Sequence, residues 1–187
     1  MNIEQLIINA TEHIDQIYFQ LPIDGKEEPI YRERVYCYEL YHQLRCIWPT
    51  NAKYMLGGEV DKEGHPLIRG NNLDRTKPDL LIHTPGNMSG NHAIIEVKPI
   101  NKTEKRKIVK DLKTLTAFRR LAGYRKAIYL FYGDGDINRL LKRIHGYQSE
   151  YEEDEINLNL IKFWWHPRSG FPACQIRNTS QTCFARR

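Results

Sequence analysis

The chain has 187 residues, of which 41% are hydrophobic and 27% are charged, and its formal net charge is +5. These values are ordinary for a soluble globular protein with a sizeable core. No apolar run is long enough to cross a bilayer, and the N-terminus lacks the basic start and apolar centre of a signal peptide. We therefore expect a cytoplasmic protein with no membrane contact.

Helical spacing of apolar residues dominates the first part of the chain. Residues 3–21 repeat apolar side chains with helical periodicity and predict an amphipathic helix. Two prolines and a glycine then interrupt the pattern at residues 21–29. A second helix is predicted over residues 31–48, and Pro49 ends it.

Strand patterns follow. Residues 52–64 predict a first strand that turns at its end. Two short apolar runs, residues 80–82 and 93–95, flank a segment rich in glycine, asparagine and serine, which is typical of a turn between two strands. These three consecutive strands are expected to form a meander.

The second half alternates helices and strands. The expected elements are a helix over 103–122, a buried strand over 126–135, a helix over 136–147, an acidic loop over 150–155 and a last strand over 156–165. Because a helix separates the meander from the fourth strand, that strand can return parallel to it. We predict one α/β domain over residues 1–187, with a mixed sheet of a three-strand meander plus a crossover strand, flanked by helices.

The cysteines do not form a recognisable metal motif. Cys37, Cys46, Cys174 and Cys183 contain no close Cys-x-x-Cys pair. Free buried thiols are therefore expected, and a zinc site is the less favoured interpretation.

Three charged residues stand at the ends of the two apolar runs. Glu96 and Lys98 are two positions apart on a strand, so their side chains point to the same face, while Val97 points into the core. Asp79 begins the preceding strand. If the two strands are antiparallel, Asp79 and Glu96 meet at one end of the sheet.

Two neighbouring carboxylates repel each other unless a positive charge lies between them. Mg²⁺ prefers oxygen ligands and keeps several waters, so two carboxylates with a backbone carbonyl can hold it. Lys98 could then orient the attacking water or offset charge on a phosphate. The alternative is structural: Glu96 and Lys98 form a salt bridge, and Asp79 caps a turn after Pro78.

Three further acids are candidates for the same site. Glu33 lies on the core-facing stripe of the second helix, where an acid needs a partner or caps the helix start. Glu39 is its rival on that helix but projects from roughly the opposite side. Glu59 lies in the first strand beside two glycines and could simply face solvent.

The motif set "ERVYCYELYHQLR", "GGEVDKEG", "KPDLLIH" and "AIIEVKP", followed by a helix and a strand, resembles the PD-(D/E)XK nuclease superfamily over about residues 30–133. The helix at 3–21 and the segment 150–187 are additions to that core. The resemblance implies a restriction-endonuclease-like fold and a small DNA endonuclease of restriction or defence type, which hydrolyses phosphodiester bonds with Mg²⁺ or Mn²⁺.

The resemblance also implies roles for individual residues. Asp79 and Glu96 would coordinate the metal with the Val97 backbone carbonyl, and Lys98 would position water or phosphate. Glu33 would support the metal, with Glu39 as its substitute, and Glu59 would be a first-strand acid near the site. Asp111 fits a weaker pattern and is expected to support structure.

Basic residues of the helix at 103–122 could lie along a phosphate backbone of DNA, or of RNA. They are Lys102, Lys105, Arg106, Lys110 and Lys113. No separate DNA-reading domain is evident, which suggests a homodimer, a partner protein or weak specificity. The alternative is a module of the same fold that has lost catalysis and binds nucleic acid or a protein. The pair Trp164–Trp165 is expected in the core or at an interface.

Overall fold

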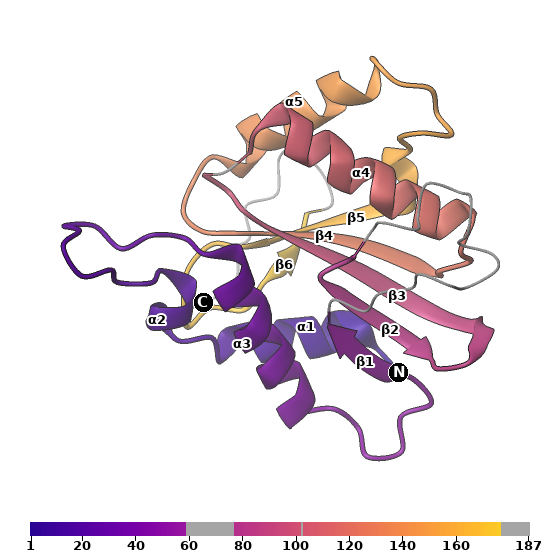
Figure 1. Cartoon of the computed structure of the whole chain (residues 1–187), viewed down its shortest axis with the longest axis horizontal. Helices are drawn as coiled ribbons and strands as arrows, with labels where there is room; N and C mark the ends of the chain where they lie inside the picture. The colour runs from indigo at the N-terminus through magenta and orange to yellow at the C-terminus, as the bar shows by residue number, and fades with distance from the viewer. Residues whose placement is uncertain (59–76, 102, 177–187) are drawn as a thin grey trace.

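A six-stranded mixed sheet forms the centre of the protein, with its strands in the order β1-β2-β3-β4-β5-β6 (Figure 1). The computed structural model describes residues 1–58, 77–101 and 103–176. The strands are β1 (Met55–Gly58), β2 (Leu80–Thr84), β3 (Asn87–Pro99), β4 (Lys126–Tyr132), β5 (Ile161–His166) and β6 (Cys174–Gln175). β1, β2 and β3 form the predicted antiparallel meander, β4 and β5 run parallel to β3, and β6 is antiparallel to β5.

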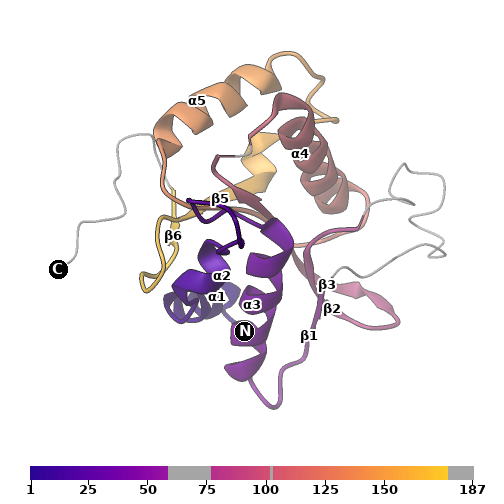
Figure 2. The same ribbon diagram turned by 60° about the vertical axis from the view of Figure 1, so that its left-hand side comes forward.

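Helices cover both faces of this sheet (Figures 1 and 2). They are α1 (Ile3–Glu12), α2 (Gln16–Phe19), α3 (Glu33–Cys46), α4 (Lys105–Arg120) and α5 (Ile137–Gln148), and a short 3-10 helix, η1 (Leu158–Leu160), precedes β5. The first three helices bury their apolar sides against one face, and α4 and α5 against the other. The protein is therefore an α/β protein with a six-stranded mixed sheet flanked by helices; the mixed sheet and its flanking helices were predicted, and the sixth strand was not.

Side-chain alternation along β3 divides its residues between the two cores. Ile94 packs in the core beneath α4 and α5, whereas Ile95 and Val97 pack in the core beneath α1, α2 and α3. Glu96 and Lys98 share the face of Ile94, because side chains two positions apart on a strand point the same way. The predicted placement of Val97 in the core is confirmed.

The crossover helix α4 explains how β4 comes to lie parallel to β3. Parallel neighbours need a long connection, and a helix with one apolar stripe supplies it while covering the sheet. Ile108, Leu112 and Leu115 form that stripe and are fully buried. The helix predicted over residues 103–122 is thus confirmed as α4, with its apolar side facing the sheet.

The prediction of one continuous N-terminal helix over residues 3–21 is wrong. The chain forms two helices, α1 and α2, separated at residues 13–15. Asp15 is extended there and begins α2. Helical spacing assigned Ile17 to the buried face, but the break changes the direction of the chain, and that side chain is exposed.

The C-terminal part also differs from the sequence-based expectation. Residues 158–160 form η1, not strand, because the Asn157 side chain accepts a hydrogen bond from the Asn159 amide and turns the chain. Trp164 and Trp165 are buried, which confirms their placement in the core. The two-residue strand β6 was not predicted, since it is too short for alternation to show.

The prediction of free buried thiols holds only for Cys37. Cys46 is a free thiol but is exposed, and Cys174 is disulfide-bonded. Cys183 lies outside the described residues. Among the helices that the structure describes, none is both long and apolar enough to cross a membrane.

Candidate active site

The candidate site lies where β3 extends beyond the end of β2. Leu80, the first residue of β2, pairs with Ile95, so the amide of Val97 meets no partner on β2. The side chain of Asp79 takes that place: its Oδ2 accepts a hydrogen bond of 2.7 Å from the Val97 amide. The strand register thus fixes Asp79 against the C-terminal part of β3.

The carboxyl groups of Asp79 and Glu96 are neighbours, close enough for the charge of Asp79 to act on Glu96. Burial raises the pKa of Asp79 to about 6, although the Val97 amide acts in the opposite direction. Burial and the neighbouring charge of Asp79 raise the pKa of Glu96 well above its usual value. Two neighbouring carboxyls with raised pKa values favour retention of a proton where no cation lies between them.

Lys98 lies between two acids from different helices. Its Nζ donates a hydrogen bond of 2.8 Å to Glu33 Oε2 and lies 3.1 Å from Asp111 Oδ2. Burial lowers the pKa of Lys98, but the charges of Asp111 and Glu33 outweigh burial and raise it above its usual value. The side chain is therefore an ammonium group although only 9% of it is exposed.

Asp111 is the site residue that the sequence analysis assigned to structural support. Its Oδ2 also accepts a hydrogen bond of 2.6 Å from the hydroxyl of Tyr129, which is fully buried on β4 beside Glu96. Burial raises the pKa of Asp111, while Lys98 and Tyr129 oppose this shift. The sequence could have indicated Asp111 as a site residue because it is an acid beside the buried apolar stripe of α4. The same kind of pattern singled out Glu33 on α3.

The structure separates the two rival acids of α3. Glu33 contacts Lys98, whereas Glu39 Oε1 accepts a hydrogen bond of 2.6 Å from Gln43 one turn later on the same helix. Of these two, Glu33 is the acid that joins the site. Glu59 lies outside the described residues.

Two of the lysines expected to contact nucleic acid are already paired with acids. Lys105 donates a 2.7 Å hydrogen bond to Glu150, and Lys113 donates a 2.6 Å hydrogen bond to Glu155. Arg106 and Lys110 are exposed and have no ion-pair partner in the part of the chain that the structure describes. Lys102 lies outside that part. The open positive charge of α4 is thus smaller than its sequence implies.

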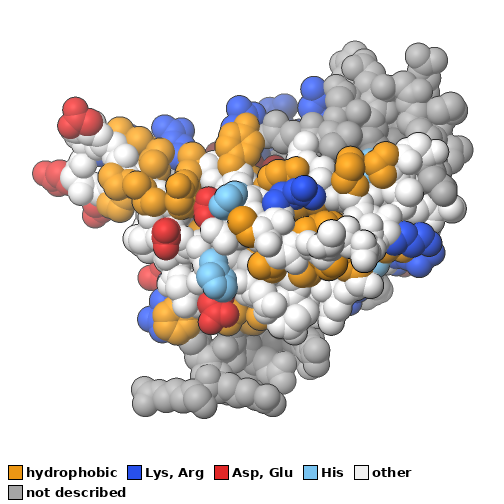
Figure 3. Space-filling model, turned by 90° about the horizontal axis from the view of Figure 1, so that it is seen from below, with side chains coloured by type: hydrophobic (Ala, Val, Ile, Leu, Met, Phe, Trp, Pro, Cys, Tyr) orange, Lys and Arg blue, Asp and Glu red, His pale blue; other side chains and the backbone are white. Residues whose placement is uncertain are grey.

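The lower face of the molecule offers no continuous basic area among its described residues (Figure 3). Hydrophobic, acidic and histidine side chains are interspersed there with a few lysines and arginines, and acids gather at the left-hand tip. A polyanion needs clustered positive charge to bind without specific contacts. The described residues of the lower face therefore give no clustered positive charge for a polyanion.

Asp79 and Glu96 form the oxygen donor set of the site. Within residues 1–58, 77–101 and 103–176, no three His, Cys, Asp or Glu side chains are grouped so that they could hold a metal ion. Mg²⁺, however, is often held by one or two carboxylates, with waters and substrate phosphates completing its shell. The amide of Val97 points toward Asp79, and the carbonyl of a strand residue projects to the same side as its amide. Two carboxyls and that carbonyl therefore fit Mg²⁺ or Mn²⁺.

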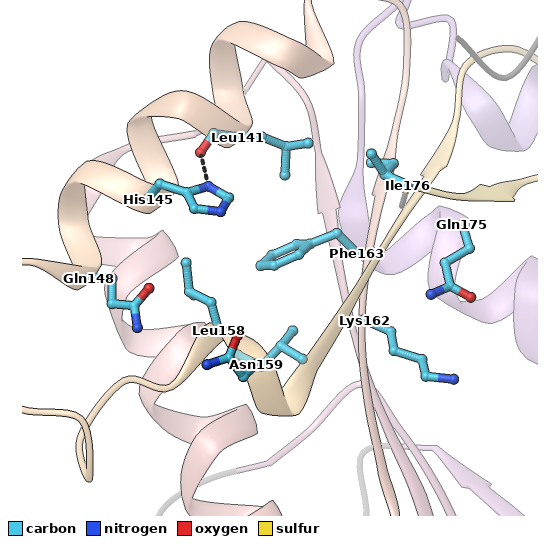
Figure 4. Close-up of a pocket in the computed structure, with 10 residues that line it drawn as sticks. Leu141, His145, Gln148, Leu158, Asn159, Lys162, Phe163, Gln175 and Ile176 are labelled. Carbon is cyan, nitrogen blue, oxygen red and sulfur yellow. Dashed lines mark hydrogen bonds between the residues drawn. The ribbon is translucent and has the colours of Figure 1, made fainter. Parts of the chain in front are cut away.

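A separate groove of about 810 Å³ lies between α5, η1, β5 and β6 (Figure 4). The ring of Phe163 points from β5 toward α5 and η1, the amides of Gln148, Asn159 and Gln175 are among the lining groups, and His145 is hydrogen-bonded to the carbonyl of Leu141 in its own helix. No carboxylate lines this groove, so it lacks the hard oxygen ligands of the acid site.

No known protein family, curated protein or solved structure matches the chain.

Proposed function

We propose that the protein is a metal-dependent nuclease with a restriction-endonuclease-like core, which hydrolyses phosphodiester bonds of DNA. The observation that carries this proposal is the Asp79–Glu96 carboxyl pair, of which Glu96 is buried and Asp79 half-buried, next to the Lys98 ammonium at the end of the meander. The element order supports it, because a helix with an acid, a three-strand meander, a crossover helix and a parallel strand are the parts of the PD-(D/E)XK pattern.

Each residue then has a definite task. Asp79 and Glu96, in their ionised form and with the carbonyl of Val97, would hold Mg²⁺ or Mn²⁺. When bound, such a cation supplies charge neutralisation at a phosphate oxygen and a more acidic water. Lys98 donates an N–H to a phosphate oxygen or to the attacking water, and its charge offsets the negative charge that develops there. DNA as the target follows from the resemblance, and RNA remains the second nucleic acid to test.

Cleavage of plasmid DNA with Mg²⁺ tests this function. We expect Asp79→Ala and Lys98→Ala each to lower the cleavage rate about 1,000-fold or more, because each removes charge stabilisation of the reacting phosphate. Circular dichroism checks that both variants remain folded. Asp154→Ala, in the exposed loop before η1, is the matched control and should cut like the parent protein. Metal-dependent cleavage that survives both substitutions would show that the site is elsewhere.

A second candidate is a module of this fold that binds nucleic acid or a partner protein without cutting. Two observations favour it: no third acid, histidine or cysteine completes a metal group among the described residues, and Lys98 is already paired on two sides. Titration calorimetry with Mg²⁺ and Mn²⁺ separates the candidates. Binding that Asp79→Ala abolishes supports the nuclease, and no binding in the parent protein supports the module.

A further inference from the structure

The two acids that hold Lys98 differ in how firmly they are themselves held. Glu33 lies in the first turn of α3 with 38% of its side chain exposed, and among the described residues its carboxylate is paired with Lys98. Asp111 lies in the middle of α4 with 11% exposed, and its Oδ2 contacts both Lys98 and the Tyr129 hydroxyl. Only Asp111 therefore gives the ammonium a fixed reference point.

Tyr129 anchors that reference point to the sheet. It pairs in register with Glu96 across β3 and β4, and its ring lies within 4.4 Å of the Phe131 ring, centroid to centroid. Its hydroxyl is thus held by the core and by the backbone of the strand next to the acid pair. Tyr129 contacts Asp111, and Asp111 contacts Lys98. These two contacts hold the ammonium nitrogen at a fixed place relative to the sheet.

Stability alone does not account for an acid at position 111. Its charge contributes to raising the pKa of Glu96, so it adds repulsion to a site that already contains Asp79, Glu96 and Glu33. A buried carboxylate is tolerated only where hydrogen bonds and an opposite charge compensate it. Those compensating partners are Tyr129 and Lys98.

We propose that Asp111, held by Tyr129, is the positioning residue that places the Lys98 ammonium for its contact with the scissile phosphate. Asp111 does not touch the substrate; it acts through Lys98. This inference rests on the proposed function where cleavage is the readout, because positioning matters only if Lys98 acts on a phosphate. A displacement of about 1 Å in a reacting group can cost about 100-fold in rate.

A double-mutant cycle tests the action through Lys98. We expect Asp111→Asn to lower kcat about 100-fold with little change in KM, and Tyr129→Phe to lower it about 10-fold, because the ammonium loses its fixed position. Adding Asp111→Asn to Lys98→Ala should cause no further loss. Independent losses that multiply in the double variant would overturn the proposal.

A second readout needs neither metal nor cleavage. NMR relaxation of the ¹⁵Nζ group of Lys98 in the metal-free protein reports how rigidly the ammonium is held. Its order parameter should fall in Asp111→Asn and in Tyr129→Phe. Thr114→Ala is the control, since Thr114 is buried one turn later on α4, whereas the described ion pairs of Lys98 are with Glu33 and Asp111.

The two readouts distinguish failure of this inference from failure of the proposed function. If the parent protein does not cut but the order parameter falls as expected, the positioning stands and the nuclease assignment is wrong. If the order parameter of Lys98 is unchanged in Asp111→Asn, the positioning role is wrong whether or not the protein cuts.

Discussion

At the residue scale, the Asp79–Glu96 pair places an electrostatic cost on the metal-free protein. Both carboxyls have raised pKa values, with burial as the main cause. An acid with a raised pKa in the folded state destabilises that state wherever the unfolded chain would be ionised. The cost is absent below the ordinary pKa of an aspartate and complete above the raised pKa.

The upward direction of these pKa shifts determines how the stability of the protein depends on pH. As pH rises from about 4 to about 6, the free energy of unfolding of the metal-free protein should decrease, because only the unfolded chain releases the proton of Asp79. Asp79→Asn should remove the cost and add up to about 3 kcal/mol at pH 7, at 1.36 kcal/mol per pKa unit. The gain should vanish at pH 4.

Denaturant unfolding in EDTA measures both effects. Asp154→Asn in the exposed loop before η1 is the matched control and should change stability by less than about 0.5 kcal/mol at either pH. A loss of stability in Asp79→Asn at pH 7 would mean that the carboxylate of Asp79 is a net stabilising group, contrary to this argument.

At the scale of elements, the two sides of α4 carry different kinds of residue. Its inner side carries Asp111 to the site, and its outer side carries the basic residues that suggested nucleic-acid binding. Acids from residues 150–155 pair with Lys105 and Lys113 on that outer side. A phosphate must compete with these acids, whereas Arg106 and Lys110 have no acidic partner within the part of the chain that the structure describes.

DNA binding should therefore depend unequally on the four positions. In the metal-free protein, Arg106→Ala and Lys110→Ala should each weaken DNA binding and reduce the slope of log K against log salt concentration by about 1. Lys105→Ala and Lys113→Ala should have smaller effects, since each of these lysines already has an acidic partner. Fluorescence anisotropy with a labelled duplex at several salt concentrations measures this, and equal effects at all four positions would contradict the argument.

At the scale of the whole molecule, Gly133 joins the sheet to the segment that precedes α3. Its amide donates to the carbonyl of His166 on β5, and its carbonyl accepts from the indole of Trp165. A Cβ at this position would lie 2.8 Å from the ring of Tyr31, two residues before Glu33, and the backbone has φ of 108°. Only glycine allows this close approach, which helps to place the start of α3 against the sheet.

Two glycine substitutions test this junction. Gly133→Ala should lower the free energy of unfolding by about 2 kcal/mol or more, because it combines backbone strain with overpacking against Tyr31. Gly146→Ala, inside α5 with open space around it, should instead raise it by up to about 1 kcal/mol. Thermal and denaturant unfolding measure both, and a neutral Gly133→Ala would show that the close approach is easily relieved.

The sequence predicted much of the fold because its signals are local. Alternation with period two put Glu96 and Lys98 on one face and Val97 in the core, and helical spacing identified the inward stripe of α4. Boundaries were less accurate: at the break between α1 and α2 the side chain of Ile14 is buried and the exposed Asp15 begins α2, which helical spacing does not detect.

The order of elements from α3 to α5, the meander and the placement of Asp79 near Glu96 could thus be derived from the sequence alone, since strand register follows from pattern and turn. Tertiary structure alone decided that Glu33, not Glu39, reaches Lys98, that Asp111 joins them, and that Lys105 pairs with Glu150. The Lys98–Glu33 contact joins residues 65 positions apart, and the Lys105–Glu150 contact joins residues 45 positions apart. Such contacts depend on how each element lies against the sheet, which is set by packing of the whole core rather than by any local pattern.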